Sequence, residues 1–193
     1  MKTMTRIAVA AIVLAAPMAV AGGAGVGDRA PDFTLSDLDG NDVTLSKIEG
    51  VRVLEWVNPD CPFVKRHYTA GTMKTLAAKY EQQGVTWLTI NSTHYMDEAA
   101  NEKFSKANGL TQTILMDPSG SVGHLYGAAT TPHMFIVDEA GMIVYVGAID
   151  DDPRGTEAEP TNYVAKALDE VLAGKPVTTA ETKPYGCSVK YAK

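Results

Sequence analysis

Residues 51–68, with the sequence VRVLEWVNPDCPFVKRHY, decide the fold. The apolar run 51–57, rich in Val, Leu and Trp, predicts a strand that is buried on both faces, as in a parallel sheet. Pro62 suits the first position of a helix, so a helix is predicted to begin at Cys61-Pro62. The stretch therefore predicts a buried core strand that leads into a helix with a cysteine at its N-terminus.

The segments on either side extend this pattern into an alternation of strands and helices. Upstream, the Gly-rich residues 22–30 are expected to form a loose leader, and residues 30–45 a hairpin that turns at Asp39-Gly40. Downstream, one long helix is expected to stop at Gly84, with Gly71 as a weak point. The other elements are predicted as strands at 85–90, 113–116, 133–137 and 142–147 and as helices at 96–106, 119–126 and 162–172. The expected fold class is α/β, with a central mixed β-sheet flanked by helices and an N-terminal β-hairpin extension.

Residues 1–21 have the pattern of a secretory signal peptide. Lys2 and Arg6 form a basic start, an apolar run covers residues 7–16, and the small residues 19–21 suit a cleavage site. The apolar run is too short to span a bilayer. We therefore expect a periplasmic or secreted protein without a membrane partner after signal removal, with one domain at residues 22–176 and a tail at residues 177–193.

The chain is acidic, with a formal net charge of −6 over 193 residues. It has no cluster of basic residues, which argues against nucleic acid and anionic membranes as partners. No bound cofactor is expected. The expected partners are thiols and disulfides of proteins or small molecules, because of the cysteine chemistry described next.

Cys61 and Cys187 are the two cysteines of the chain. In an oxidising compartment, such a pair indicates a disulfide, although two cysteines are too few to build a disulfide scaffold. The fold must therefore depend on its apolar core.

The predicted helix start places Cys61 where a thiolate is favoured. Free backbone N–H groups and the positive end of the helix dipole both stabilise a negatively charged sulfur. Lys65 lies four residues on, on the same helical face, and adds a positive charge. Arg66 and His67 also lie in the first turns, where the helix dipole disfavours cations, so an anion is expected nearby. The alternative is that these charges are solvated surface groups around a structural half-cystine.

Glu55 is an acid inside the apolar strand 53–57. A buried carboxylate is costly unless it is paired, and burial would raise its pKa towards a value suited to proton transfer. The alternative is that Glu55 points to solvent near a strand end.

Several motifs resemble the thioredoxin superfamily: the order of the elements, a cysteine directly after the first core strand, and Thr131-Pro132 before the strand 133–137. The sequences APDFTL at 30–35 and VDEAG at 137–141 are similar to the redoxin branch, which includes alkyl hydroperoxide reductases and thiol-specific antioxidants. CPFVKRHY at 61–68, together with YGCSVKY at 185–191, resembles an exported peroxiredoxin-like subgroup.

The resemblance implies roles for three residues. Cys61 matches the nucleophilic first cysteine of the thioredoxin C-x-x-C motif, and Pro132 matches the cis-proline that packs against it. Glu55 falls where thioredoxins place their buried acid, which supports proton transfer.

The chain also departs from the family pattern. Val64 stands where the second cysteine of C-x-x-C would be, so no resolving thiol lies within that helix turn. Leu54 and Asn58 stand where peroxiredoxins have Pro and Thr before their cysteine, which argues against ordinary peroxidase activity.

The leading hypothesis is a thiol-disulfide oxidoreductase of the extracytoplasmic space, with Cys61 as nucleophile and Cys187, on a mobile tail, as resolving cysteine. A hydroperoxide reductase would use the same thiolate through a sulfenic acid. A copper-binding or copper-delivery module would use Cys61, His67, His133 and Cys187, with His94 as a further candidate, because thiolates and imidazoles are ligands for copper. In a catalytically silent protein, a Cys61–Cys187 disulfide would be only a staple, worth about 5 kcal/mol.

Overall fold

The computed structural model describes residues 22–193, so the predicted signal peptide at 1–21 lies outside the described residues. The centre of the fold is one seven-stranded sheet, built from β1 (Thr34–Asp37), β2 (Asp42–Thr44), β3 (Arg52–Trp56), β4 (Thr86–Asn91), β5 (Thr113–Met116), β7 (His133–Val137) and β8 (Ile143–Gly147). The strands follow the order β2-β1-β5-β4-β3-β7-β8. The pairs β3–β4 and β4–β5 are parallel and the other pairs antiparallel, which confirms the mixed sheet and the N-terminal hairpin.

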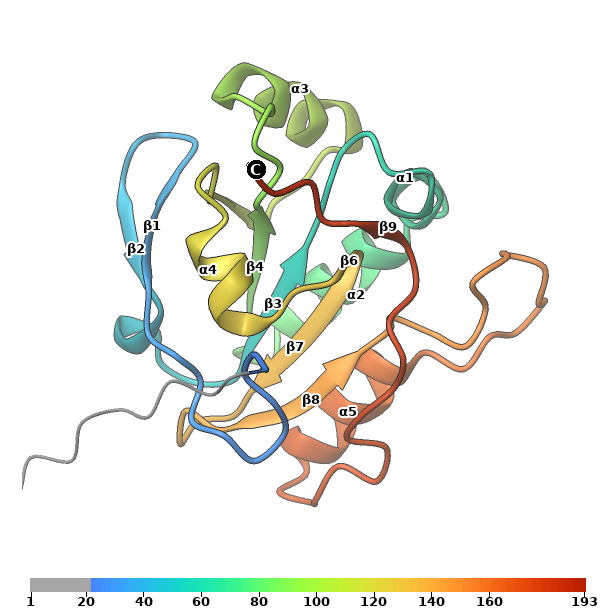
Figure 1. Ribbon diagram of the computed structural model, residues 1–193. Coiled ribbons are helices and arrows are strands. Elements are labelled where there is room, and N and C mark those ends of the chain that lie inside the picture. Colours follow the sequence, from blue (N-terminus) through green and yellow to red (C-terminus); the bar gives the residue numbers. More distant parts are fainter. Residues whose placement is uncertain (1–21) are drawn as a thin grey trace, which may run out of the picture.

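Helices cover both faces of this sheet (Figure 1). The helices are α1 (Pro62–Thr69), α2 (Thr72–Glu81), α3 (Glu98–Asn108), α4 (Ser121–Tyr126) and α5 (Tyr163–Leu172), with a short 3-10 turn, η1 (Leu45–Lys47). Side chains of α1, α2 and α5 pack in one apolar cluster with one face of the sheet, and side chains of α4 pack in a second cluster with the other face.

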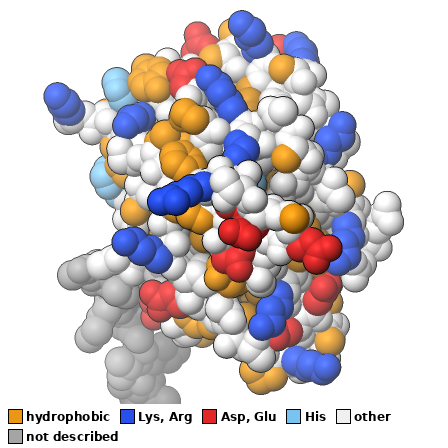
Figure 2. Space-filling model, turned by 90° about the vertical axis from the view of Figure 1, so that its right-hand side faces the viewer, with side chains coloured by type: hydrophobic (Ala, Val, Ile, Leu, Met, Phe, Trp, Pro, Cys, Tyr) orange, Lys and Arg blue, Asp and Glu red, His pale blue; other side chains and the backbone are white. Residues whose placement is uncertain are grey.

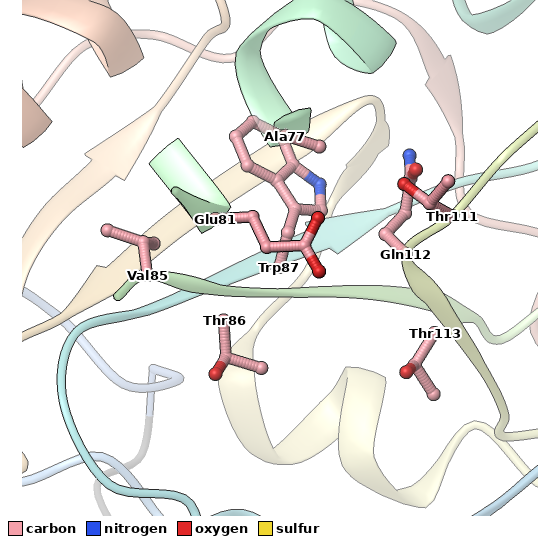
Figure 3. Close-up of a pocket in the computed structure, with 8 residues that line it drawn as sticks. All are labelled: Ala77, Glu81, Val85, Thr86, Trp87, Thr111, Gln112 and Thr113. Atoms are coloured by element: carbon pink, nitrogen blue, oxygen red, sulfur yellow. The ribbon is translucent and has the colours of Figure 1, made fainter. Parts of the chain in front are cut away.

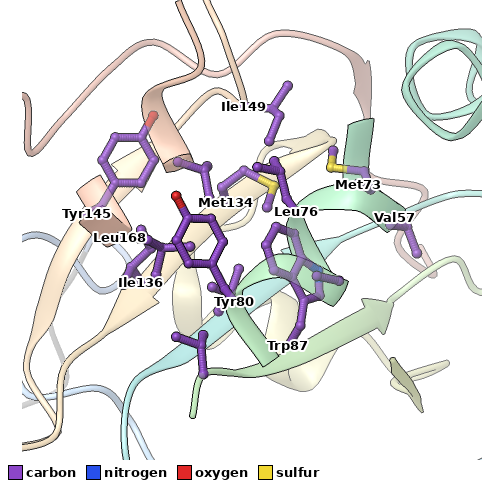
Figure 4. Close-up of a cluster of buried hydrophobic side chains, with 14 of the residues drawn as sticks. Val57, Met73, Leu76, Tyr80, Trp87, Met134, Ile136, Tyr145, Ile149 and Leu168 are labelled. Carbon is purple, nitrogen blue, oxygen red and sulfur yellow. The ribbon is translucent and has the colours of Figure 1, made fainter. Parts of the chain in front are cut away.

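The alternation of side chains along β3 assigns its residues to the two clusters. Val53 belongs to the cluster under α1, α2 and α5, whereas Leu54 and Trp56 belong to the cluster under α4. Figure 4 shows the first cluster, in which side chains of α2, β7 and α5 meet. Because both faces are covered, every residue of β3 is buried, as the apolar run predicts.

The single long helix predicted after Cys61 is wrong, because the chain forms α1 and α2 instead. Gly71 separates them with φ at 77°, a left-handed conformation that an α-helix cannot contain. The break occurs at the predicted weak point. It allows α1, which follows Cys61, to take a different direction from α2.

The leader and the tail are both tied to the domain, unlike the loose segments expected from the sequence. In the leader, the N–H groups of Gly27 and Ala30 donate to the carbonyls of Ile143 and Gly141, each at 2.9 Å. The tail contains β9 (Cys187–Ser188), which pairs with β6 (Thr130–Thr131) in a second, two-stranded sheet (Figure 1). A two-residue strand is too short to produce a periodic pattern, so it could not be predicted from the sequence.

Within residues 22–193, no helix has the length and apolar character needed to cross a membrane. The face in Figure 2 carries Lys and Arg side chains interspersed with Asp and Glu side chains. On this face, the basic side chains do not gather into one patch.

Candidate active site

Cys61 is the N-cap residue of α1, directly after the loop that follows β3. Its side chain is only 2% exposed, because it belongs to the apolar cluster under α1, α2 and α5. The Sγ atom donates a hydrogen bond to the carbonyl oxygen of Thr131 at 3.0 Å. The predicted helix start therefore places this sulfur beside the loop that contains the Thr131-Pro132 peptide, which is cis.

The tail brings Cys187 to the same place. Thr131 and Cys187 are partners in the antiparallel β6–β9 pair, and the Cys187 side chain hydrogen-bonds to that of Cys61. Gly186 permits this close approach, because a Cβ atom there would lie 2.1 Å from the Thr131 carbonyl oxygen. Both cysteines are free thiols in this structure. Two residues 126 positions apart in the chain thus form one dithiol pair.

The two thiols have opposite pKa shifts. Burial raises the pKa of Cys61, but hydrogen bonds from the side chains of Cys187 and Thr131 and from backbone N–H groups outweigh it, so the pKa lies below that of an ordinary cysteine. Burial and the adjacent Cys61 raise the pKa of Cys187 to about 11. Cys61 is therefore the sulfur that ionises first, and Cys187 is the proton donor that stabilises it.

We predict that Cys61 titrates below the ~8.5 of a free thiol in the reduced protein. The Cys187→Ala variant should raise this pKa, because alanine removes the thiol that donates to Cys61. The measurement is the ultraviolet absorbance of the thiolate against pH. Cys61→Ala is the matched control, in which the remaining thiol, Cys187, should titrate above the free value. A Cys61 midpoint at or above 8.5 in the unmodified protein would contradict the prediction.

Lys65 pairs with an acid at the surface. Its Nζ atom lies 3.9 Å from Asp60 Oδ1, and both side chains are well exposed, at 59% and 60%. Exposed pairs of this kind are weak. The contacts that lower the pKa of Cys61 most come from Cys187 and Thr131.

Glu55 is fully buried, so its side chain does not point to solvent. Its two carboxyl oxygens accept hydrogen bonds from the Tyr68 hydroxyl at 3.0 Å and from the Trp87 indole N–H at 2.7 Å. Burial raises the pKa of Glu55 to about 7, although these two bonds oppose the shift. Tyr68 lies on α1 and is in the same apolar cluster as Cys61, so the acid lies on the cysteine side of the sheet.

A small pocket lies beside Trp87 (Figure 3). It has a volume of about 120 Å³, and Glu81, Trp87 and Gln112 are among the residues that line it. Neither cysteine lines it, so this pocket is separate from the dithiol pair.

A polar cluster around Tyr185, which we call the Tyr185 cluster, lies between α1 and the tail. It consists of Arg66 and His67 of α1, Asp150 of the 148–162 loop, and Tyr185 of the tail. His67 is only 3% exposed, and burial lowers its pKa to about 4, so it is neutral at neutral pH. The anion expected near Arg66 and His67 is thus the carboxylate of Asp150, whose Oδ2 lies 3.9 Å from His67 Nδ1, with Asp152 close by.

The histidines and cysteines of the copper hypothesis do not form one group. His67 belongs to the Tyr185 cluster, and His133 Nδ1 accepts a hydrogen bond from the Ala129 N–H at 3.2 Å. In the part of the chain that the structure describes, no three His, Cys, Asp or Glu side chains are arranged to hold a metal ion. The geometry therefore gives no support to the copper-binding alternative.

Sequence reasoning missed Thr131, Asp150 and Tyr185 as residues around the dithiol pair. Tyr185 lies in the YGCSVKY motif, in which only Cys187 has a predicted role, and the crowding of basic residues in α1 is the one signal for Asp150. The motifs CPFVKRHY and YGCSVKY contact each other directly, through Cys61–Cys187 and through His67–Tyr185.

The model of the AhpC/TSA family matches residues 26–146. The chain belongs to this family. It is 31% identical over 126 residues to the thiol-disulfide oxidoreductase ResA of Geobacillus thermodenitrificans. This match covers 61% of this chain and 66% of ResA, so the chain spans just under two thirds of that relative's length. It is 30% identical over 144 residues to a "Putative peroxiredoxin" of Mycobacterium tuberculosis, which covers 72% of this chain and 90% of that protein.

Solved structures of relatives share the fold. A hypothetical protein of Sinorhizobium meliloti has a TM-score of 0.79 at 33% identity, and the match covers 86% of this chain and 94% of that one. A "putative Thiol:disulfide interchange protein DsbE" of Chlorobium tepidum has a TM-score of 0.57 at 27% identity, covering 64% and 85%. The fold of this AhpC/TSA family member is thioredoxin-like, which confirms the resemblance seen in the sequence.

Proposed function

We propose that this protein is a thiol-disulfide oxidoreductase in which Cys61 is the nucleophile and Cys187 the resolving cysteine. The observation that carries the proposal is the Cys187 thiol hydrogen-bonded to Cys61, with the two pKa values shifted in opposite directions. A staple needs only that two cysteines be close. The different pKa values also assign an order of reaction, because the lower pKa marks the attacking sulfur.

The reaction has two exchange steps, each of which makes one S–S bond and breaks one. In the first, the Cys61 thiolate attacks a substrate disulfide, and the substrate's other sulfur leaves as a thiolate that takes up a proton. In the second, Cys187 loses its proton and attacks Cys61, which releases the second substrate thiol. The substrate gains two electrons and two protons, and the protein is left with a Cys61–Cys187 disulfide that an external dithiol must reduce.

Three further residues support these steps in the proposal. Glu55, with a pKa near 7 and on the cysteine side of the sheet, accepts the proton of Cys187 during the second step. Pro132 shapes the loop that presents the Thr131 carbonyl to Cys61, and the exposed Lys65 adds positive charge on α1, four residues after Cys61. The substrates are disulfides of proteins or small molecules. The signal-like residues 1–21 support a periplasmic or secreted location.

A hydroperoxide reductase is the second candidate, favoured by the similarity to the "Putative peroxiredoxin". In that reaction, the Cys61 thiolate would attack the peroxide, forming a sulfenic acid and releasing an alcohol or water. Cys187 would then displace water from the sulfenic sulfur and form the same disulfide. The two candidates differ in the oxidant that Cys61 attacks and in the intermediate on Cys61, which is a mixed disulfide in one and a sulfenic acid in the other.

We predict that the Cys187→Ser variant traps a mixed disulfide between Cys61 and the substrate. The second step needs Cys187, so the intermediate cannot be released within the chain. Mass spectrometry after exposure to insulin or a small disulfide should find one substrate equivalent on Cys61. In the unmodified protein, the same exposure should yield the Cys61–Cys187 disulfide instead, counted as the loss of both free thiols.

A parallel reaction with hydroperoxide separates the two candidates. Faster loss of the Cys61 thiol with disulfide than with hydroperoxide at equal concentration supports the oxidoreductase, and the reverse order supports the peroxide reductase. If both thiols stayed alkylatable after both treatments, neither reaction would take place and both proposals would fail.

A further inference from the structure

The Tyr185 hydroxyl is bonded to three side chains from two other parts of the chain. It donates to Asp150 Oδ1, and it lies 2.9 Å from His67 Nε2 and 3.2 Å from Arg66 Nη2. Because its one hydrogen is given to Asp150, the hydroxyl oxygen accepts from Arg66 Nη2, and His67 Nε2 lies within hydrogen-bond distance of both the Tyr185 hydroxyl and Arg66 Nη2. Tyr185 is thereby held between α1 and the 148–162 loop.

The partners of Tyr185 are themselves fixed. Asp150 Oδ1 also accepts the N–H of Asp152 at 3.1 Å, and the carboxylate of Asp152 accepts three further backbone N–H groups of the loop. Arg66 Nη2 donates to the carbonyl oxygen of Asp152 at 2.9 Å. The loop is therefore folded around its own aspartates, and Tyr185 docks onto a preformed site.

Tyr185 stands two residues before Cys187, and Arg66 and His67 belong to the helix that begins next to Cys61. The Tyr185 cluster thus connects the segment that carries one thiol to the helix that follows the other. The tail has other attachments. The β6–β9 pair holds the Cys187 backbone beside Thr131, and farther along the tail the Tyr191 hydroxyl donates to the Ala128 carbonyl at 2.7 Å and the Thr182 hydroxyl contacts Tyr145 at 2.7 Å. Among these attachments, the Tyr185 cluster is the one that bonds the tail to side chains of α1.

We propose that Tyr185 is a positioning residue whose hydroxyl holds Cys187 at Cys61 and thereby sets the redox equilibrium of the dithiol pair. This inference rests on the proposed function, because it takes Cys61 and Cys187 as the reacting pair. A tail already held in place loses little conformational freedom when the disulfide forms, so the effective concentration of one thiol at the other is high. The cluster also keeps Cys187 in position to donate to the Cys61 thiolate.

The test is the equilibrium of the protein with reduced and oxidised glutathione. Forming the protein disulfide breaks the S–S bond of oxidised glutathione and releases two glutathione thiols, so the ratio of the two protein forms gives the equilibrium constant. Tyr185→Phe keeps the ring and removes the hydroxyl. It should lower the equilibrium constant for disulfide formation at least about five- to tenfold, because one hydrogen bond of ordinary net strength accounts for that factor and the hydroxyl makes contacts with three side chains. It should also raise the pKa of Cys61, read from thiolate absorbance.

Two variants serve as matched controls. Tyr80→Phe removes another hydroxyl, which donates to the Ala165 carbonyl at 2.9 Å between α2 and α5, so it loses a comparable bond away from the tail. Tyr191→Phe removes the tail hydroxyl that binds Ala128. In both variants, the equilibrium constant for disulfide formation should stay within about twofold of that of the unmodified protein.

Each outcome has one meaning. An unchanged equilibrium constant and Cys61 pKa in Tyr185→Phe would overturn the inference while leaving the proposed function intact. An equal fall of the equilibrium constant in Tyr185→Phe and Tyr191→Phe would also overturn the inference, because any attachment of the tail would then set the redox equilibrium equally well. If the unmodified protein formed no Cys61–Cys187 disulfide at any glutathione ratio, the proposed function itself would fail.

Discussion

Replacing Cys61 with serine is expected to abolish disulfide exchange, with a fall in rate on the order of a thousandfold or more. A serine hydroxyl stays protonated at neutral pH, and the hydrogen bonds that stabilise a Cys61 thiolate cannot make it an effective nucleophile. The fold should survive, since serine is nearly the same size and its hydroxyl can donate to the Thr131 carbonyl as the thiol does. Insulin reduction or exchange with a chromogenic disulfide measures the rate, and circular dichroism checks the fold.

Cys187→Ser is the matched control for this variant, because it makes the same substitution in the partner thiol. It should keep the first exchange step, seen as a single burst of substrate thiol, while losing turnover. If Cys61→Ser retained the burst and Cys187→Ser lost it, the roles of the two cysteines would be reversed.

Replacing Glu55 with glutamine is expected to stabilise the protein above neutral pH, by up to about 3 kcal/mol. Burial raises the pKa of Glu55 from 4.5 to about 7, so the folded state binds this proton more tightly than the unfolded state does. The free energy of unfolding of the unmodified protein therefore falls as the pH rises from about 4.5 to about 7, and the penalty is constant above that range. Glutamine resembles the protonated acid and does not titrate.

The stability difference between the two proteins should thus be small near pH 4 and reach its full size near pH 8. Urea unfolding at several pH values measures it. Asp117→Asn is a matched control in a second buried acid, whose carboxylate accepts hydrogen bonds from the Ser92 hydroxyl at 2.6 Å and the Gly123 N–H at 2.9 Å. Both of these bonds are to Oδ2, whereas Oδ1 accepts the Val122 N–H at 3.4 Å. That variant should lose stability, because an asparagine oxygen at the Oδ2 position leaves the amide nitrogen facing the Val122 N–H, from which it cannot accept a hydrogen bond.

The same Glu55→Gln variant should exchange disulfides at least about tenfold more slowly near neutral pH, because it cannot take the proton of Cys187. Faster exchange, or an unchanged rate with an unchanged stability profile, would remove Glu55 from the mechanism. A gain in stability with an unchanged rate would leave Glu55 as a buried acid without a part in exchange.

The sequence predicted those features that depend on local chemistry. The cysteine at a helix start, the acid inside an apolar strand and the hairpin turn at Asp39-Gly40 are each encoded within a few neighbouring residues, and the structure has all three. The predicted bounds of the strand 133–137 match those of β7, because an apolar run bounded by proline and a turn is a strong local signal.

The remaining features depend on contacts between distant segments. The tail gave no periodic pattern, and its pairing with Thr131 is visible only once the chain folds back over more than fifty residues. The Tyr185 cluster was likewise hidden, since Arg66 and Asp150 come together only through the packing of α1 against the 148–162 loop. The division of the first helix at Gly71 was only partly visible, because a glycine permits a break without requiring one.

Gly186 makes the meeting of the two sulfurs depend on a residue that has no side chain. Any other amino acid there would bring a carbon against the Thr131 carbonyl oxygen and push the tail outward. Selection for the reaction between the two cysteines, in nature or in a saturation library, should therefore retain only glycine at this position. A homologue that keeps both cysteines but has another residue at position 186 would hold its two sulfurs too far apart to react. The residue at position 186 therefore distinguishes homologues that retain the dithiol chemistry from those that have lost it.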